Sequence, residues 1–263
     1  MIVYDAGVTL NGSSRKTLRE WLREAPFSLT MSAGFFGFFA HCGVLTVLED
    51  AGLLPSRVSG ASAGALVAGT WAAGVDAPEI ARVLLTLQRA DFWDPRVGPG
   101  LLRGKLFRAR LDTLLPARTF EACRVPAAVS VYDVLARRVR PLASGALAPA
   151  LHASCAVPFM FHPVWIAGRP FIDGGVSDRP GLAGMPTGGR VLFHHLASRS
   201  PWRRRGSPSM DIPSRDAMTS VVIDDLPRVG PFRLAQGARA FDVARRKMAM
   251  ALASHVDANV VRV

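Results

Sequence analysis

Cysteine is scarce in this chain of 263 residues, which contains only Cys42, Cys123 and Cys155. An odd number of cysteines without the spacing of metal ligands excludes a disulfide-framed secreted scaffold and favours a reducing compartment. The sequence also lacks a heptad, collagen-like or solenoid repeat. With 49% hydrophobic and 20% charged residues, the chain has the composition of a globular protein and is too apolar to be disordered as a whole.

Uninterrupted hydrophobic runs are missing as well. Residues 25–48 contain no Asp, Glu, Lys or Arg, but Pro26, Gly34 and His41 interrupt the stretch, and its pattern changes from β-like to helical. Prolines break the second uncharged stretch, residues 141–168, so no single helix runs through it. The first residues lack the basic, apolar and small-residue succession of a secretory signal. We therefore expect a cytoplasmic protein, with peripheral contact to membranes left open.

Lysine is nearly absent from a chain that is otherwise strongly basic. Lys and Arg together number 32 against 20 Asp and Glu, a formal net charge of +12, and only three of the basic residues are lysines. A guanidinium group offers two parallel donors to a phosphate, so this surface suits lipid headgroups or nucleic acid. Because the arginines are scattered and no recognition motif is present, we expect no nucleic-acid partner.

Strand and helix patterns alternate along the first half of the chain. Residues 27–31 read as a buried strand, and a glycine turn leads to a helix over about residues 39–51. A short strand at 57–59 and a buried helix at 63–73 repeat this unit, which is typical of a parallel α/β sheet. We also expect helices near residues 14–23, 77–89, 148–154 and 235–254, strands at 127–134, 138–142 and 191–195, and a hairpin over 164–172.

The sharpest motif is a serine between two glycines, Gly60-Ala61-Ser62-Ala63-Gly64, where a predicted strand ends and a buried helix begins. This G-x-S-x-G pattern in a strand–turn–helix context is the nucleophile elbow. Small residues around Ser62 avoid collision with the neighbouring strand and helix, and the N-terminus of the helix favours developing negative charge. A packing turn of small residues is the alternative, but the context favours a nucleophilic Ser62.

A second glycine turn follows the first predicted strand. There the backbone N–H groups of Gly34, Phe35, Phe36 and Gly37 can hold the oxyanion of a tetrahedral acyl intermediate. A dinucleotide loop is less consistent with the sequence, because the glycine spacing is wrong and no acidic residue follows the second strand. The phenylalanines of this turn are either core or one wall of an acyl-chain pocket: Phe35, Phe36, Phe38 and Phe39.

Two kinds of base could deprotonate Ser62. Asp173 ends a short predicted strand and precedes Gly174 and Gly175, where a carboxylate can project, although an Asp-Gly pair is also a common turn. His194 or His195, near the end of another strand, would complete the order Ser…Asp…His of an α/β-hydrolase triad. The residues alone leave both alternatives open, and the other candidate histidines are His41, His152 and His162.

Three ordered blocks of the sequence resemble the patatin-like phospholipases. The first two blocks hold the glycine turn and Ser62, over residues 29–45 and 60–69, and the third leads through residues 153–163 to Asp173-Gly174-Gly175. The resemblance covers roughly residues 27–182. We treat 183–263 as the rest of the same domain, so that a single domain is expected over residues 1–263.

The resemblance implies a three-layer α/β/α sandwich around a mainly parallel sheet. It also implies a lipid acyl hydrolase in which Ser62 is the nucleophile, Asp173 is its base and no catalytic histidine is needed. The oxyanion donors would come from the turn at Gly34–Gly37, and no cofactor or metal is expected. The residues expected to contact the substrate are Phe35, Phe36, Phe38 and Ala63.

Two positions depart from the family pattern. The oxyanion segment of the family usually carries Arg or Lys near the position of Gly37, and phenylalanines here replace two of its usual glycines. After Asp173-Gly174-Gly175, the family often has Asp-Asn before a proline, where this chain has Asp178-Arg179-Pro180. Backbone donors survive such changes, but the path of the oxyanion turn is not fixed by the resemblance.

The basic surface suggests a membrane role. Trp202, Arg203, Arg204 and Arg205 in the predicted loop 202–216, together with Trp21, Trp93 and the phenylalanine turn, could hold the protein against anionic lipid. A solvated basic loop without a partner is the alternative. Two other functions stay open: a Ser–His–Asp esterase, and a catalytically silent lipid-binding protein of the same fold.

Overall fold

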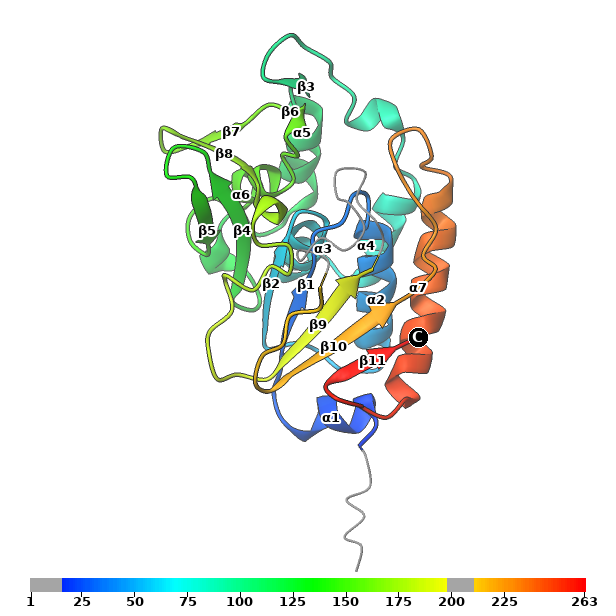
Figure 1. Cartoon of the computed structure of the whole chain (residues 1–263). Coiled ribbons are helices and arrows are strands. Elements are labelled where there is room, and N and C mark those ends of the chain that lie inside the picture. Colours follow the sequence, from blue (N-terminus) through cyan, green and yellow to red (C-terminus); the bar gives the residue numbers. More distant parts are fainter. Residues whose placement is uncertain (1–15, 198–210) are drawn as a thin grey trace, which may run out of the picture.

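The computed structural model describes residues 16–197 and 211–263. Within this part of the chain, a nine-stranded sheet has the order β11-β10-β9-β1-β2-β4-β8-β7, with β5 also paired to β4, and helices flank it (Figure 1). The strands of this sheet are β1 Ser28–Met31, β2 Arg57–Ala61, β4 Ala127–Asp133, β5 Arg138–Leu142, β7 Val164–Ile166, β8 Arg169–Asp173, β9 Val191–Leu196, β10 Met218–Ile223 and β11 Val260–Arg262. A separate pair joins β3 Gly100–Leu102 to β6 Phe159–Phe161. The helices are α1 Leu18–Glu24, α2 Phe38–Asp50, α3 Ala63–Ala72, α4 Ala77–Leu85, α5 Lys105–Leu114, α6 Leu147–Ser154 and α7 Gln236–Ala253.

The central strands are parallel, as the alternation of strand and helix patterns predicts. β11, β10, β9, β1, β2 and β4 run parallel to their neighbours, whereas β5, β8 and β7 add an antiparallel edge. Leu29 and Met31 of β1 lie in one core cluster with apolar residues of α2, α3 and α7. The intervening Thr30 points to the other face, where its hydroxyl donates to the carbonyl of Pro180. The predicted mostly parallel α/β fold is confirmed.

Along one edge of β4, the pairing partner changes from β2 to β8, and this change positions the site. Val131 pairs with Asp173 of β8 and with Arg140 of β5, while Ser130 pairs with Ala61 of β2. Because β5 occupies one edge of β4 from Val129 to Asp133, β2 and β8 share the other edge in succession. The end of β2 and the end of β8 therefore meet beside Ser130.

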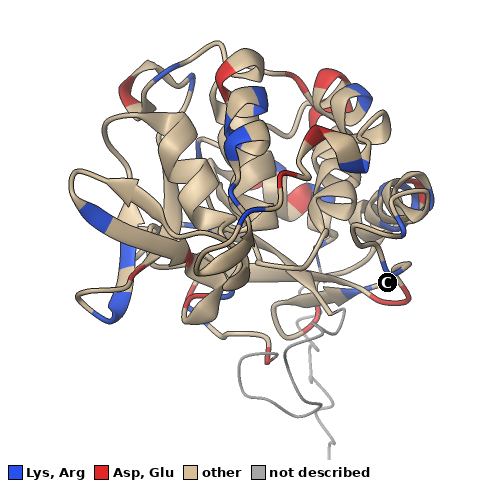
Figure 2. Ribbon diagram, turned by 90° about the horizontal axis from the view of Figure 1, so that it is seen from above, with Lys and Arg blue, Asp and Glu red and all other residues tan. Residues whose placement is uncertain are grey.

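Most predicted elements agree with the structure within a few residues, but the helix α5 and the strands β3, β6, β10 and β11 were not predicted. The expected helix at 77–89 ends at Leu85, and the expected helix at 14–23 begins at Leu18, where the Thr17 side chain caps it in a capping box with Glu20. None of the described helices is both long and apolar enough to cross a membrane. Lys and Arg are spread over several helices and loops, with Asp and Glu among them (Figure 2).

Candidate active site

Ser62 occupies the sharp corner between β2 and α3. Its backbone has φ 52° and ψ −120°, in the left-handed half of φ space that a side chain rarely adopts. Strain of this kind is held in place by surrounding structure and is concentrated at functional sites. The Ser62 N–H donates to the hydroxyl of Ser154 at 2.9 Å, and the residue is 8% exposed. Ser62 therefore has the conformation of a nucleophile elbow.

The glycines on both sides of Ser62 are required by close backbone approach. A Cβ at Gly64 would lie 2.1 Å from the carbonyl oxygen of Met31 on β1, and a Cβ at Gly60 would lie 2.6 Å from the backbone nitrogen of Ala65. No substitution could be accommodated at either position without moving backbone. The steric explanation of the G-x-S-x-G motif is confirmed.

Asp173 ends β8 and is 5% exposed. One of its carboxylate oxygens accepts the N–H of Gly175 at 2.7 Å, and its own N–H donates to the carbonyl of Ala156 at 2.9 Å. A Cβ at Gly174 would lie only 2.0 Å from the carbonyl oxygen of Ser130, so the glycine lets the chain turn directly against β4. The carboxylate is thus fixed in a buried turn at the edge where β4 changes partner.

A short hydrogen-bonded path connects Ser62 to β4, the strand that pairs with β8 at Asp173. The Ser154 hydroxyl accepts the Ser62 N–H and donates to the carbonyl of Ser130 at 2.7 Å, and the next residue, Val131, pairs with Asp173. The neighbouring Cys155 also contacts Ser62. Its thiol donates to the Ser62 carbonyl at 3.3 Å, while burial and then the charge of Asp173 raise the pKa of that thiol.

Sequence reasoning overlooked Ser130, Ser154 and Cys155. Ser154 acts through its hydroxyl and Ser130 through its backbone carbonyl, and no sequence motif marks either role. Cys155 is a lone cysteine without a recognisable pattern. The third block of the resemblance includes Ser154 and Cys155, and this was the one signal that pointed to this segment.

The oxyanion turn offers fewer donors than the sequence predicts. The Gly37 N–H donates to the Gly34 carbonyl at 2.9 Å and closes the turn, so it is not available to a substrate. In the described part of the chain, no backbone carbonyl pairs with the N–H groups of Gly34, Phe35 or Phe36. Phe36 has φ 53°, which shows that the turn bends sharply there. Of the four predicted donors, the N–H of Gly37 is therefore engaged within the turn, and those of Gly34, Phe35 and Phe36 stay candidates.

Ala63, which sequence reasoning assigned only to substrate contact, is a further candidate for a backbone donor. It is the first residue of α3, and the first N–H groups of a helix have no partner within the helix. The positive end of the helix also faces charge that develops on a neighbouring acyl group. In a nucleophile elbow, the N–H of the residue after the serine is one of the oxyanion donors.

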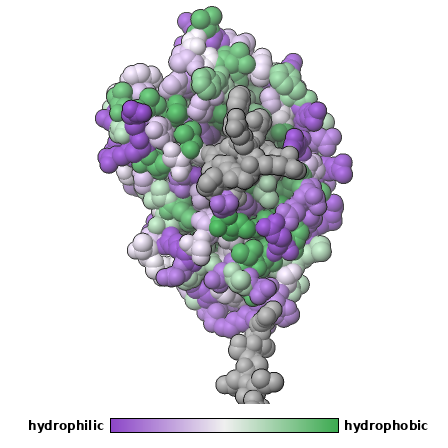
Figure 3. Space-filling view, in the orientation of Figure 1, coloured by the Kyte–Doolittle hydropathy of each residue, from purple (hydrophilic) through white to green (hydrophobic). Residues whose placement is uncertain are grey.

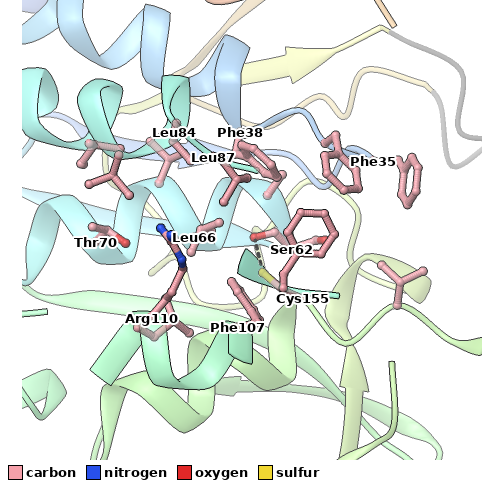
Figure 4. A pocket seen from close by; sticks show the side chains of 18 of the residues that line it. Phe35, Phe38, Ser62, Leu66, Thr70, Leu84, Leu87, Phe107, Arg110 and Cys155 are labelled. Carbon is pink, nitrogen blue, oxygen red and sulfur yellow. Dashed lines mark hydrogen bonds between the residues drawn. The ribbon is translucent and has the colours of Figure 1, made fainter. Parts of the chain in front are cut away.

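An apolar cavity of about 130 Å³ opens beside Ser62 (Figure 4). Phe35, Phe36, Phe38 and Ala63 all line it, as expected for substrate contacts, and Gly34 and Cys155 border it as well. Phe39, the fourth phenylalanine of the turn, is 2% exposed and belongs to the main core. Of the four phenylalanines of this turn, three therefore line the cavity, and the fourth, Phe39, packs in the core.

His194 and His195 do not line this cavity. The Nε2 of His41 lies 2.8 Å from the Ser32 carbonyl and must donate to it, so its Nδ1 accepts from Nδ1 of His194, also at 2.8 Å. Burial lowers the pKa of His41 to about 3 and that of His194 well below its ordinary value. His195 lies 3.4 Å from a nitrogen of Arg179. These histidines are engaged beneath the oxyanion turn rather than beside Ser62.

The remaining histidines and the tryptophans lie elsewhere. His152 is buried against Phe107 and Phe161, and His162 lies near the backbone of Arg96. Trp21 belongs to α1 and Trp93 lies in the segment between α4 and β3, and α1 and β3 are at opposite ends of the view in Figure 1. The four residues 202–205 lie outside the described residues. No group of His, Cys, Asp or Glu in the described ranges is arranged to hold a metal ion.

The protein thus has an α/β fold with a strained serine at a strand–helix corner, beside an apolar cavity. The chain matches the patatin-like phospholipase family over residues 29–184, more than half of its length, and it belongs to that family. The predicted resemblance is confirmed.

Individual relatives agree with this assignment. Uncharacterized NTE family proteins of Mycobacterium bovis and Mycobacterium tuberculosis are 30% identical over 155 residues, which cover 57% of this chain and 43% of theirs. The chain thus spans less than half the length of these relatives. The crystal structure of VipD from Legionella pneumophila has a TM-score of 0.63 and 16% identity, over 88% of this chain and 67% of that one. This likeness concerns the fold.

Proposed function

We propose that this protein is a serine lipid acyl hydrolase, of phospholipase A or carboxylic ester hydrolase type, with Ser62 and Asp173 as a catalytic dyad. The observation that carries the proposal is the strained Ser62 beside an apolar cavity, with the buried Asp173 at the end of β8, the strand that follows β2 along the same edge of β4. Membership of the patatin-like phospholipase family supports lipid esters as the substrate class.

In the proposed reaction, Asp173 takes the hydroxyl proton of Ser62 while the serine oxygen attacks the ester carbonyl carbon. The N–H groups of Gly34, Phe35 and Ala63 stabilise the resulting oxyanion. The C–O bond to the alcohol breaks, and the alcohol leaves with the proton from Asp173. Water then attacks the acyl-enzyme, Asp173 accepts a proton from that water, and the fatty acid leaves as the Ser62 hydroxyl is restored.

Labelling with a fluorophosphonate, followed by hydrolysis of p-nitrophenyl acyl esters, tests the dyad. Ser62→Ala should abolish both labelling and hydrolysis, and Asp173→Asn should reduce hydrolysis by at least about a hundredfold, the size of a general-base contribution. His194→Ala and His195→Ala should keep activity if they keep the fold. Loss of hydrolysis in a folded His194→Ala or His195→Ala protein would favour the Ser–His–Asp esterase, and absence of labelling in the unsubstituted protein would favour the silent lipid-binding alternative.

We also propose peripheral contact with anionic membranes, through the turn that carries β3. Val97 is fully exposed, Leu101 is 51% exposed and Phe159 of the adjacent β6 is 79% exposed. Arg96 and Arg103 flank them, and this end of the molecule mixes hydrophobic and hydrophilic side chains (Figure 3). Apolar side chains beside arginine suit the interface of an anionic bilayer.

Sedimentation with vesicles that contain phosphatidylglycerol tests this contact. Val97→Glu should weaken binding at low salt, whereas Leu135→Glu, at another exposed apolar position, should not. The triple Ala variant of Arg203, Arg204 and Arg205 tests whether the basic segment that the sequence suggests for membrane contact is needed. Vesicle binding that none of these changes affects would refute membrane contact through either segment.

A further inference from the structure

From Ser62, the cavity extends along α3 toward two further polar side chains. In Figure 4, Ser62 and Cys155 lie near the middle of the lining, Phe35 lies on one side of them, and Thr70 and Arg110 lie on the other. The wall between them comes from α3, α4, α5 and the segment after α4, through Leu66, Val67, Leu84, Leu87 and Leu111. The arrangement is a channel with a defined direction, leading away from the nucleophile.

The length of the channel follows from the helix that forms its floor. Ser62, Leu66 and Thr70 repeat every four residues along one side of α3, and eight residues of helix rise by about 12 Å. An extended hydrocarbon chain advances by about 1.25 Å per carbon, from C–C bonds of about 1.5 Å at nearly tetrahedral angles. A chain that begins at Ser62 and stops at Thr70 therefore has about ten carbons.

Arg110 forms part of the wall at the far end. It lines the channel and also an outer groove between α4 and α5, together with Val83 and Leu114, which border both spaces. In the groove, its guanidinium pairs with the carboxylate of Asp91 at 2.5 Å. Arg82 lies in the same groove, pairs with Glu79 and does not touch the channel. Arg110 is thus shared by the wall of the channel and the groove, and its ion pair with Asp91 lies on the groove side.

We propose that the Arg110–Asp91 ion pair closes the acyl channel and restricts the substrate to esters of unbranched acyl chains of about ten carbons. The inference rests on the proposed hydrolase function. A longer chain would have to press its methyl end against a charged guanidinium and remove water from it, which is unfavourable without a new polar partner. Carbons that remain outside the channel contribute no burial, and each buried methylene is worth about fourfold in affinity.

The test compares chain-length profiles of two independent measurements. One is hydrolysis of p-nitrophenyl esters from four to sixteen carbons, and the other is binding of free fatty acids of the same lengths to the Ser62→Ala protein, by displacement of a fluorescent fatty acid. Arg110→Ala removes the closing side chain. Arg82→Ala is the matched control, since it removes an arginine from the same groove without touching the channel. Leu66→Phe narrows the middle of the channel.

The unsubstituted protein should prefer about eight to ten carbons, and both measurements should decline beyond about twelve. Arg110→Ala should raise the ratio of the hydrolysis rate of the sixteen-carbon ester to that of the ten-carbon ester at least tenfold. Arg82→Ala should leave this ratio unchanged. Leu66→Phe should move the optimal chain length to shorter chains. Equal rates on ten and sixteen carbons in the unsubstituted protein, or equal ratios in Arg110→Ala and Arg82→Ala, would overturn the inference. Binding with an optimum near ten carbons but no hydrolysis of any ester would refute the hydrolase function and leave the channel intact.

Discussion

Lowering the pH from 7.5 to 5.0 is expected to destabilise the fold, because several histidines are buried in their neutral form. His152 is 7% exposed, its ring meets Phe107 and Phe161 edge to face, and its Nε2 has no hydrogen-bond partner among the described residues. Burial, and secondarily the charge of Arg108, lower the pKa of His152 from 6.5 to about 4. Its protonation therefore opposes the native state.

The sign and size of the effect follow from proton linkage. Above pH 6.5 the imidazole is neutral in both states, so the pKa difference has no effect there. Below pH 6.5 the unfolded chain binds a proton that the native protein does not bind until about pH 4, so stability falls as pH falls. At pH 5.0 this loss is about 2 kcal/mol, from about 1.4 kcal/mol per pH unit.

Other buried histidines act in the same direction and window. Burial lowers the pKa of His41 to about 3 and that of His195 to about 4, so each adds a loss of similar size at pH 5.0. Three such groups together cost about 6 kcal/mol, comparable to the whole stability of many domains. Carboxylates contribute little in this window, because their ordinary pKa values lie near 4.

Urea unfolding at pH 7.5 and 5.0 measures the effect. His152→Phe and His152→Gln each remove one titrating group, so both should lose about 2 kcal/mol less than the unsubstituted protein between the two pH values. Their absolute stabilities will differ, because one side chain fills the apolar site and the other does not, but the change with pH should be the same. Variants whose stability falls as steeply with pH as that of the unsubstituted protein would refute this reasoning.

Three further predictions concern the site. Gly64→Ala should destabilise the protein by about 3 kcal/mol in urea unfolding, or prevent folding, because its Cβ would collide with a carbonyl of β1. The control Gly189→Ala adds a Cβ in open space and should change the urea midpoint little. Ser154→Ala removes the acceptor for the Ser62 N–H and should lower the kcat of ester hydrolysis by about tenfold while thermal unfolding shows an intact fold. Iodoacetamide at pH 7.5 should leave activity unchanged over hours, because burial raises the pKa of the Cys155 thiol; rapid loss of activity with a modified Cys155 in mass spectra would contradict this.

The elbow could be predicted from the sequence because its constraints are local. Close backbone contacts require glycine at positions 60 and 64, and these contacts come from residues near Ser62 and from one neighbouring strand. The proximity of the ends of β2 and β8, which carry Ser62 and Asp173, is different, since it depends on the pairing of β4 first with β2 and then with β8. No periodicity in the sequence specifies that exchange, and the resemblance to the family supplied it.

Helix α5 was missed because its apolar side does not pack as a core helix does. Only Leu111 is buried among its residues, and Phe107, Arg110 and Leu114 face the cavity instead. Gly104, which precedes the helix, has φ 79° and offers no capping side chain. A helix that lines a channel therefore gives a weaker periodic signal than one that fills a core, and the predicted site lacked one of its walls.

Ser130 shows why the rest of the site could not be predicted from residue types. Its carbonyl accepts the Ser154 hydroxyl and also requires a glycine at position 174, while its side chain donates to Asp178 at 2.5 Å. Two of these three functions belong to the backbone and would be the same with any residue at that position. The sequence therefore identifies the groups proposed to react, but the strand that pairs with both β2 and β8 acts through atoms that every residue shares.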